Sequence, residues 1–515
     1  MSSSPIDGGT GEHSTRTWWL VSTAAVALLA FLGYRQFLDL ALLGLDTFPM
    51  ILSGRILSFQ DFVGTFTEEL MDGMYPDGHF YRPVANLAFA LDYALWRMTP
   101  LGYHITDLVI LIANATLLSA LVRKLFGPRA LVGAFLAGML FVLHPIQLEL
   151  VPAPPRRADA LCAGFLLACL LAQPDPDRPL RQTRWRTTLS ALFALLAVGS
   201  KETGAIALPM VFALQFLRAG GPSLKARLAA ASRHSVAPFL ALGVFMLARN
   251  AVLSGLGGHA GSSLAGLGNM RELIVTYASR VLYPQYIFGS DLDRGRIFVA
   301  VLSIAIFLGT VAIWRWPATS VVRERTQVRT GFLFLGAWSI CLLCISSLAG
   351  RVHDWYVMLF VAPYAVGLGM LVDRSIALIR SSRPLPAILP LAAALLAIGS
   401  HVAYSPLCRD YDGWSKAGQV ADAQIVRFEN VLAKGQPGKR ALLDRFVPWI
   451  PPEAFGSGIQ SAYLHADHSL QAYAQLVHPE QAVHVDFHTG GPLPPPPSPD
   501  VFQVILYTGI AGDAR

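Results

Sequence analysis

Ionisable and aromatic side chains recur at one set of junctions between the apolar runs of this chain. The first is Asp46, which follows the first apolar run. The others are Tyr81, Arg82, His104, His144, Glu149, Arg156, Arg157, Asp159, Lys201, Glu202, Arg351, His353, Asp354 and Tyr356. Ionisable groups at a bilayer are energetically unfavourable without a partner or a function, so the whole set predicts a functional site. Any single member is better explained as an interfacial anchor or a helix-end charge.

These residue types suit the transfer of a sugar from a lipid-linked phosphate. A site on the far side of the membrane has no cytosolic nucleotide sugars, so an activated sugar has to arrive on a lipid. Guanidinium and ammonium groups bind phosphate, and arginine does so in a bidentate manner. The expected donor-binding set is Arg82, Arg157, Lys201 and Arg351, with Tyr81 and His144 as further contacts.

A carboxylate is needed to take the proton of the acceptor hydroxyl as that hydroxyl attacks the sugar. We expect Asp46 to be this general base. With one base and no covalent intermediate, attack inverts the anomeric centre. Acceptor contacts or a second acid are expected among Glu149, Asp159, Glu202 and His104.

Several of these residues have a simpler explanation. His144 precedes Pro145, which by itself ends a helix. Glu149 has three possible roles: a second acid, a metal ligand or a solvated loop charge. Considered by itself, this residue is best explained as a solvated loop charge. Asp159 could pair with Arg157 at the head of one helix, and His104 could anchor another at the interface. Lys201 and Glu202 are harder to dismiss, because two apolar runs leave little loop around them.

Composition identifies the elements that hold these residues. Among 515 residues, 54% are hydrophobic and 14% charged, and the mean hydropathy is +0.48. Apolar runs long enough to cross a bilayer recur along the chain, which predicts an all-α polytopic membrane protein. The net charge of +7 comes from arginines in short loops, as in cytoplasmic loops beside anionic lipid, and does not indicate nucleic-acid binding. The spacing of the five cysteines predicts neither a set of disulfide bonds nor a four-ligand metal site.

About eleven transmembrane helices are predicted within residues 18–403, after a cytoplasmic leader at 1–17. The first run, 18–37, is too long for a signal-peptide core and is expected to be retained. It leads into an external loop at 38–101, in which 84–96 is amphipathic and predicted to lie on the membrane surface. Residues 271–290 resemble a second surface helix. Alternate short loops are rich in arginine, which places the amino terminus in the cytoplasm and the carboxyl tail outside.

Residues 404–515 differ from the membrane part. They are polar and contain a helical stretch at 414–432, the Pro-rich segment GGPLPPPPSPD and an expected strand at 502–507. We expect a small extracytoplasmic domain of mixed α/β structure. The spacing of its five histidines, His465, His468, His478, His484 and His488, matches no tight metal site.

Three motifs in order resemble TMTC-type O-mannosyltransferases and their bacterial relatives. HFYRPVANLAFALDYALWRMTPLGYHITD is similar to that family's YRP, LDYALW and GYH segment, HPIQLELVPAPPRRADAL to its HP, E and R.D.L run, and AVGSKETGAIALP to its KE segment. AGRVHDWYVMLFVAP matches more weakly. The resemblance covers most of the membrane part and none of the tail.

The resemblance implies the GT-C fold and a polyprenyl-phosphate-sugar donor, with mannose as the candidate sugar. It also implies a catalytic acid just after the first helix, which is the position of Asp46. No cofactor is expected. The sequence leaves open whether a divalent cation is needed, and because lipid-phosphate sugars, unlike pyrophosphates, do not require one, we favour a reaction without metal. The chain departs from the family at Leu45, where a second acid is frequent, and at Ser53 and Asp107, where the family has Asn. A protein, glycan or lipid acceptor and a bacterial inner membrane are expected. The alternatives are a flippase of lipid-linked sugars and a non-catalytic scaffold.

Overall fold

The apolar runs form long helices that lie side by side in a computed structural model of the chain. It describes residues 9–74, 78–176, 180–220, 223–255, 257–259, 270–282, 292–316, 321–347, 354–433, 440–444, 449–450, 462–479, 484–488 and 501–505. The bundle helices are α1 Gly9–Tyr34, α5 Pro100–Phe126, α6 Leu131–Leu143, α7 Arg157–Ala172, α8 Leu180–Ser200, α9 Ala207–Arg218, α10 Leu224–Leu253, α11 Met270–Leu282, α13 Leu292–Arg315, α14 Val322–Ser347, α15 Asp354–Arg380 and α16 Leu385–Ala403.

The predicted polytopic helical architecture is confirmed. Within the described residues, seven helices are long and apolar enough to cross a membrane: α1, α5, α10, α13, α14, α15 and α16. Four further helices, α6, α7, α8 and α9, occupy the remaining expected runs but are shorter or more polar. Each of the eleven expected runs therefore coincides with a helix, and the number of crossings stays a prediction. The expected surface helix at 271–290 corresponds to α11, and residues 283–290 lie outside the described part.

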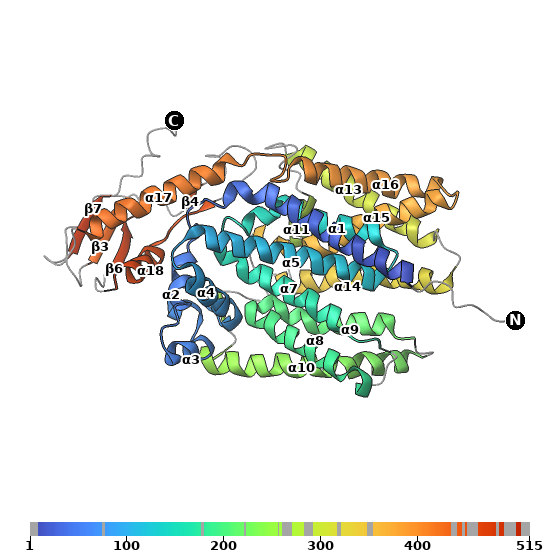
Figure 1. Cartoon of the computed structure of the whole chain (residues 1–515), viewed down its shortest axis with the longest axis horizontal. Helices are drawn as coiled ribbons and strands as arrows, with labels where there is room; N and C mark the ends of the chain where they lie inside the picture. The colour runs from blue at the N-terminus through green and yellow to red at the C-terminus, as the bar shows by residue number, and fades with distance from the viewer. Residues whose placement is uncertain are drawn as a thin grey trace.

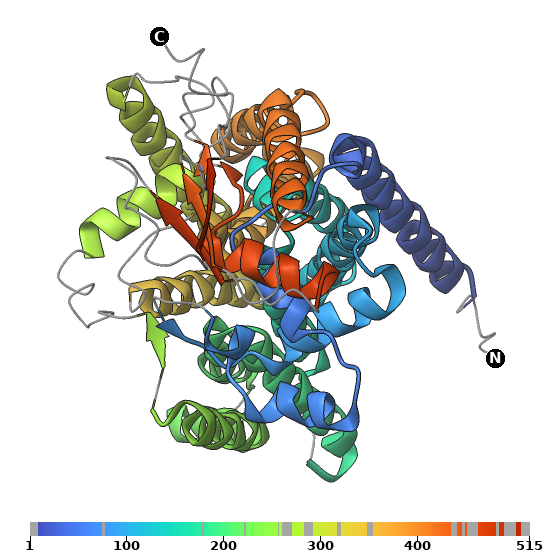
Figure 2. The same cartoon turned by 90° about the vertical axis from the view of Figure 1, so that its left-hand side faces the viewer.

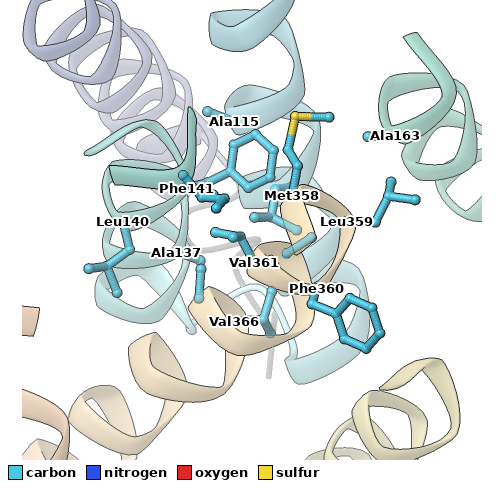
Figure 3. Close-up of a cluster of buried hydrophobic side chains, with 14 of the residues drawn as sticks. Ala115, Ala137, Leu140, Phe141, Ala163, Met358, Leu359, Phe360, Val361 and Val366 are labelled. Carbon is cyan, nitrogen blue, oxygen red and sulfur yellow. The ribbon is translucent and has the colours of Figure 1, made fainter. Parts of the chain in front are cut away.

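The centre of the bundle is the packing of α6 against α15. Close approach is possible because glycines face each other: a Cβ added to Gly369 would lie 2.5 Å from the carbonyl oxygen of Gly133. Figure 3 shows buried hydrophobic side chains of the same two helices, with Ala137 and Phe141 from α6 and Val361 and Val366 from α15. This core fixes the positions of the helix ends that carry the polar residues.

The first external loop folds into short elements at one end of the bundle. They are α2 Thr47–Ser53, α3 Phe59–Thr67, β1 Gly78–His79 and α4 Pro83–Trp96. The helix expected at 84–96 is therefore present as α4, and it packs against α2, α5 and α8. Strand β1 pairs antiparallel with β2 Gly258–His259, which joins this loop to the segment after α10.

The described part of the tail has mixed structure. After α17 Asp412–Leu432 comes a three-stranded parallel sheet, in which β3 Arg440–Asp444 lies between β6 His484–His488 and β7 Val501–Ile505. Helix α18 Asp467–Val477 packs against β6 and also against α2 of the first loop. The Pro-rich segment lies outside the described residues. Whether the tail is an independent domain stays a prediction.

The first loop and the tail lie at the same end of the molecule. Figure 1 shows α2, α3, α4 and the tail strands at the left end of the bundle, and the start of α1 at the right end. Figure 2, seen from that left end, shows the tail strands and α18 lying over the ends of the bundle helices. This arrangement agrees with the expectation that both segments face one side of the membrane.

Candidate functional site

A polar cavity of about 410 Å³ brings together residues that are far apart in the sequence. Its charged lining residues are Arg82, Asp159, Lys201, Glu202 and Arg249. Tyr356, Thr203 and Ser346 add hydroxyl groups, and Phe80, Phe245 and Leu359 add apolar surface. Four of the five charged residues were predicted from the sequence as site candidates.

Every charged group of this cavity is paired with another. Arg82 donates to Glu202 from Nη2 at 2.9 Å and from Nε at 3.2 Å. Arg249 Nη1 lies 3.2 Å from the same carboxylate. Lys201 Nζ donates to both oxygens of Asp159 at 2.6 Å and lies 4.7 Å from the centre of the Tyr356 ring. Among the described residues of the cavity, three cations thus face two carboxylates, a net charge of +1.

Burial makes these pairs strongly coupled. The Arg249 and Lys201 side chains are 5% and 8% exposed, whereas Glu202 is 31% exposed. Burial by itself raises the pKa of Glu202, but Arg82 and Arg249 outweigh it and bring that pKa down to about 2. Burial lowers the pKa of Lys201, nearby Arg82 adds to this, and Asp159 opposes it. Glu202 is therefore ionised at neutral pH.

Breaks in the helices place these groups. Arg82 precedes Pro83, whose fixed φ suits the first position of α4, so the arginine is held at the start of that helix. Lys201 ends α8 and begins a 3₁₀ turn, Glu202–Ile206, before α9. Arg249 lies in the last turns of α10. Gly257 follows with φ +60°, and a Cβ there would lie 2.6 Å from the His79 carbonyl oxygen and 3.1 Å from Arg249 Nη2.

A second, largely apolar cavity of about 470 Å³ adjoins the first. Leu359 and Phe360, consecutive residues of α15, line the polar and the apolar cavity respectively. Tyr277 of α11 lines the apolar cavity and lies within electrostatic range of Tyr356, which lines the polar one. Helices α13 and α14 complete its walls with Ile306, Phe307 and Leu335. A charged head group and an apolar chain could therefore occupy neighbouring spaces.

Asp46 lies at the start of α2 and does not line the polar cavity. Its side chain is 26% exposed, and His468 of the tail lies 3.5 Å from its Oδ1. The two regions are connected by the turn before α7. A Cβ on Gly44 would lie 3.1 Å from Pro155, and the next residue, Arg156, lies within electrostatic range of Tyr356.

Arg157 is buried in a network outside the cavity. Its side chain is 0% exposed, with Nη1 2.5 Å from Asp92 and Nε 2.6 Å from Asp107. The rings of Phe89 and Tyr103 lie 4.7 and 5.9 Å from its guanidinium carbon. Asp92, Tyr103, Asp107 and Arg157 all belong to the quoted family-like motifs, so these motifs meet in one buried ion cluster. Asp159 does not pair with Arg157 but with Lys201.

The other predicted residues have separate contacts. His104 is buried between the carbonyl oxygens of Val151 and Leu40, at 2.7 and 3.0 Å. The Tyr81 hydroxyl donates to the Phe66 carbonyl, and its ring packs on Phe245. These contacts tie the first loop to helices α5 and α10.

His144 ends α6 and is buried beside Tyr364 and His401. Its Nε2 lies 2.8 Å from the Val281 carbonyl. Glu149 ends the 3₁₀ turn that follows, and this turn contacts α15. None of His104, Tyr81, His144 and Glu149 lines the polar cavity.

The fourth predicted phosphate ligand cannot be placed. Arg351 and His353 lie outside the described residues, and Asp354 begins α15. Within the described part of the chain, no three His, Cys, Asp or Glu side chains are arranged to hold a metal ion. Among the tail histidines, His465 is buried against Phe48 of α2, and His468 contacts Asp46.

Sequence reasoning missed three functional candidates. Arg249 lies at the predicted external end of an apolar helix, where positive charge is unfavoured. This departure from the positive-inside bias could have marked Arg249 as a functional residue. Asp92 lies on a helix that was predicted to lie flat on the membrane, so no buried charge was expected there. The pairing of His468 with Asp46 joins residues 422 positions apart in the chain, and nothing in their local sequence indicates it.

The predicted resemblance to O-mannosyltransferases is confirmed by sequence comparison. The chain is 31% identical over 194 residues to protein O-mannosyl-transferase Tmtc1 of Drosophila melanogaster. The aligned segment is 37% of this chain and 22% of the relative. It is 32% identical over 126 residues to human TMTC3, covering 24% and 13%. The chain thus spans about a fifth or less of these relatives. No family model matches it.

Comparison of folds finds similar solved structures. One is ArnT from Cupriavidus metallidurans bound to undecaprenyl phosphate, at 14% identity and a TM-score of 0.48 over 91% of this chain and 89% of that one. Another is AglB, an oligosaccharyltransferase from Archaeoglobus fulgidus, in complex with an inhibitory peptide and a dolichol-phosphate, at 13% identity and a TM-score of 0.46 over 92% and 64%.

Proposed function

We propose that this protein is a GT-C-type membrane glycosyltransferase. It would transfer a sugar, with mannose as the candidate, from a polyprenyl phosphate to a hydroxyl acceptor on the extracytoplasmic face. The observation that carries the proposal is the polar cavity, in which Arg82, Lys201 and Arg249 are buried around two carboxylates. Sequence similarity to O-mannosyltransferases supports the same reaction class.

The charge of the cavity suits the donor. A polyprenyl-phosphate sugar is a phosphodiester with one negative charge, and the cavity has one net positive charge. Arg82 and Arg249 share Glu202, so a phosphate beside them can accept from Arg82 without separating it from its carboxylate and is attracted by the charge of Arg249. Lys201 stays positioned by Asp159. The adjoining apolar cavity offers space for the first part of the polyprenyl chain.

Asp46 remains our proposed general base. The carboxylates of the polar cavity are held by arginine or lysine, whereas Asp46 faces a histidine and keeps a solvent-exposed side. In the proposed step, Asp46 takes the acceptor hydroxyl proton as that oxygen bonds to the anomeric carbon. The bond between that carbon and the phosphate oxygen breaks, and polyprenyl phosphate leaves with the electron pair. Attack opposite the phosphate inverts the anomeric centre.

Sugar transfer in proteoliposomes tests the proposal. Purified protein receives radiolabelled polyprenyl-phosphate sugars and a mixture of peptide, glycan and lipid acceptors, with Asp46→Asn as the matched variant. We expect transfer by the wild type and its loss in Asp46→Asn, with donor binding retained. Equal transfer in both contradicts the role of Asp46 and directs attention to Asp159 and Glu149.

The same vesicles test the alternatives. Movement of the labelled carrier across the bilayer without any transfer would identify a flippase instead. Donor binding with neither movement nor transfer would identify a non-catalytic scaffold. The clustering of the charged residues at helix ends rather than within the helices favours the enzyme over a transporter.

A further inference from the structure

The tail helix α18 is packed onto the first-loop segment that carries Asp46. The Phe48 ring of α2 lies between His465 and Tyr473 of the tail, with ring centres 5.1 and 5.0 Å apart. Leu470 and Leu476 of α18 are buried in the same cluster. The tail therefore docks through a continuous apolar core, and this core determines which residues of α18 face Asp46.

His468 is the residue of α18 that reaches Asp46. Its Nε2 lies 3.5 Å from Asp46 Oδ1, and its Nδ1 lies 3.2 Å from Oδ1 of Asp467. Carboxylate oxygens are acceptors, so a ring with a carboxylate at each nitrogen is satisfied only when both nitrogens carry protons. The His468 side chain is 14% exposed, so little water competes for these contacts.

The electrostatics agree with this geometry. Burial lowers the pKa of His468, but the contacts with Asp46 and Asp467 outweigh it and raise the pKa to about 9. His468 in turn lowers the pKa of Asp467. At neutral pH His468 is therefore an imidazolium.

We propose that His468 is a positioning residue for Asp46, supplied by the tail. The imidazolium lies beside Oδ1 of Asp46, fixes the orientation of this carboxylate and leaves Oδ2 for the acceptor hydroxyl. Docking of α18 thus completes the acceptor side of the site, while the polar cavity holds the donor. This inference rests on the proposed function, because it assigns the use of Asp46 in that reaction.

The test is the separate effect on kcat and KM of transfer by the full-length protein in proteoliposomes. His468→Ala removes the cation beside Oδ1 of Asp46, so this carboxylate is no longer held toward the acceptor hydroxyl. Because misplacing a reacting group by about 1 Å can cost about 100-fold in rate, kcat should fall by about tenfold or more. The KM for the donor should stay unchanged, since the polar cavity is left intact.

Two further variants separate positioning from a general structural role. His468→Lys restores a cation, so kcat should return toward the wild-type value. Gln471→Ala, on the same helix, should leave kcat unchanged. A kcat that His468→Ala does not lower overturns the proposal, as does a kcat that stays at the His468→Ala value in His468→Lys.

Hydrogen exchange keeps the inference testable if the wild type transfers no sugar. Exchange of residues 467–477 is then compared in His468→Ala, Asp46→Asn and the double variant. If the two side chains interact, the increases in the single variants should not add in the double variant. Additive increases mean that the pair does not form and overturn the inference. Non-additive increases support the pairing, and the failure then lies with the proposed function.

Discussion

At the scale of single residues, the arginines near the site differ in how many carboxylates neutralise them. We use this difference to assign each arginine either to the stability of the fold or to the binding of an anion. Arg157 faces two, Asp92 and Asp107, and has no positive charge to spare. Arg82 and Arg249 share one, Glu202, so this trio keeps a net positive charge. We therefore assign Arg157 to the stability of the fold and the other two arginines to the binding of an anion.

Replacing Arg157 with methionine tests the structural assignment. It would leave Asp92 and Asp107 buried without their cation, and breaking a buried pair in this way costs about 3–5 kcal/mol. We expect a large loss of folded protein and a lower melting temperature in detergent. Arg383→Met, at an exposed position, should have little effect. A normally stable Arg157→Met protein that binds donor poorly would instead place Arg157 in the binding site.

Replacing Arg249 with glutamine tests the ligand-binding assignment. One charge-assisted contact to a phosphate is worth about 1.5–3 kcal/mol, so donor affinity should fall about tenfold or more. Folding should be retained, because Glu202 keeps Arg82. Lys225→Gln, exposed at the other end of α10, is the control and should bind donor normally. Unchanged affinity in Arg249→Gln would remove this arginine from the donor site.

The sequence predicts the residue types of the site better than their partners. Arg82, Lys201, Glu202 and Asp159 were expected because charges at the ends of apolar runs require a reason. Their pairing was not predictable, since Arg82 and Glu202 are 120 positions apart and Lys201 and Asp159 are 42. Such contacts depend on which helices lie side by side. Hydrophobic patterning gives no information on that arrangement.

At the scale of elements, the sequence predicts the helices of the membrane part better than the strands of the tail. Runs of about 20 apolar residues predict helices because a bilayer leaves the backbone few other ways to satisfy its hydrogen bonds. The tail has no such constraint. Its expected final strand at 502–507 is present as β7, and residues 506–507 lie outside the described part. β3 has no two-residue alternation, whereas β6 does alternate, as HVDFH, and was not predicted from the sequence. Their parallel pairing depends on contacts remote in sequence.

Docking of α18 should depend on pH. His468 has a folded-state pKa of about 9, above its ordinary value of 6.5, so its protonated form stabilises the docked state. This contribution is complete below about pH 6.5 and is lost as the pH rises through about 9. Among the described residues, Glu429 of α17 is a further acid that contacts α18. Its carboxylate accepts a hydrogen bond from the hydroxyl of Tyr473.

The measurement is amide protection of residues 467–477 between pH 6 and 9.5, corrected for the intrinsic exchange rate. We expect protection to decrease across that interval in the wild type. His468→Lys should keep its protection to a higher pH, because lysine titrates near 10.4. Equal pH profiles for the two proteins would show that His468 does not couple docking to protonation.

At the scale of the whole molecule, the sidedness of the site determines which donor is available. The first loop and the tail share one end of the bundle, and the start of α1 lies at the other (Figure 1). Helix ends with Arg123, Lys124, Arg218 and Arg227 favour a cytoplasmic location for the end opposite the site. An extracytoplasmic site excludes nucleotide sugars as donors, and for this reason the proposed donor is a lipid.

Cysteine labelling tests this orientation. Cys408 is exposed between α16 and α17, whereas Cys162 and Cys169 are buried and Cys341 and Cys344 lie in α14. With these four replaced by alanine, a membrane-impermeant maleimide should label Cys408 in intact spheroplasts. Lys225→Cys, in a chain without other cysteines, should be labelled only after the membrane is permeabilised. The reverse pattern would place the polar cavity in the cytosol. Nucleotide sugars would then be available to it, and the argument for a polyprenyl-phosphate donor would fail even if Arg82, Lys201 and Arg249 bind a phosphate.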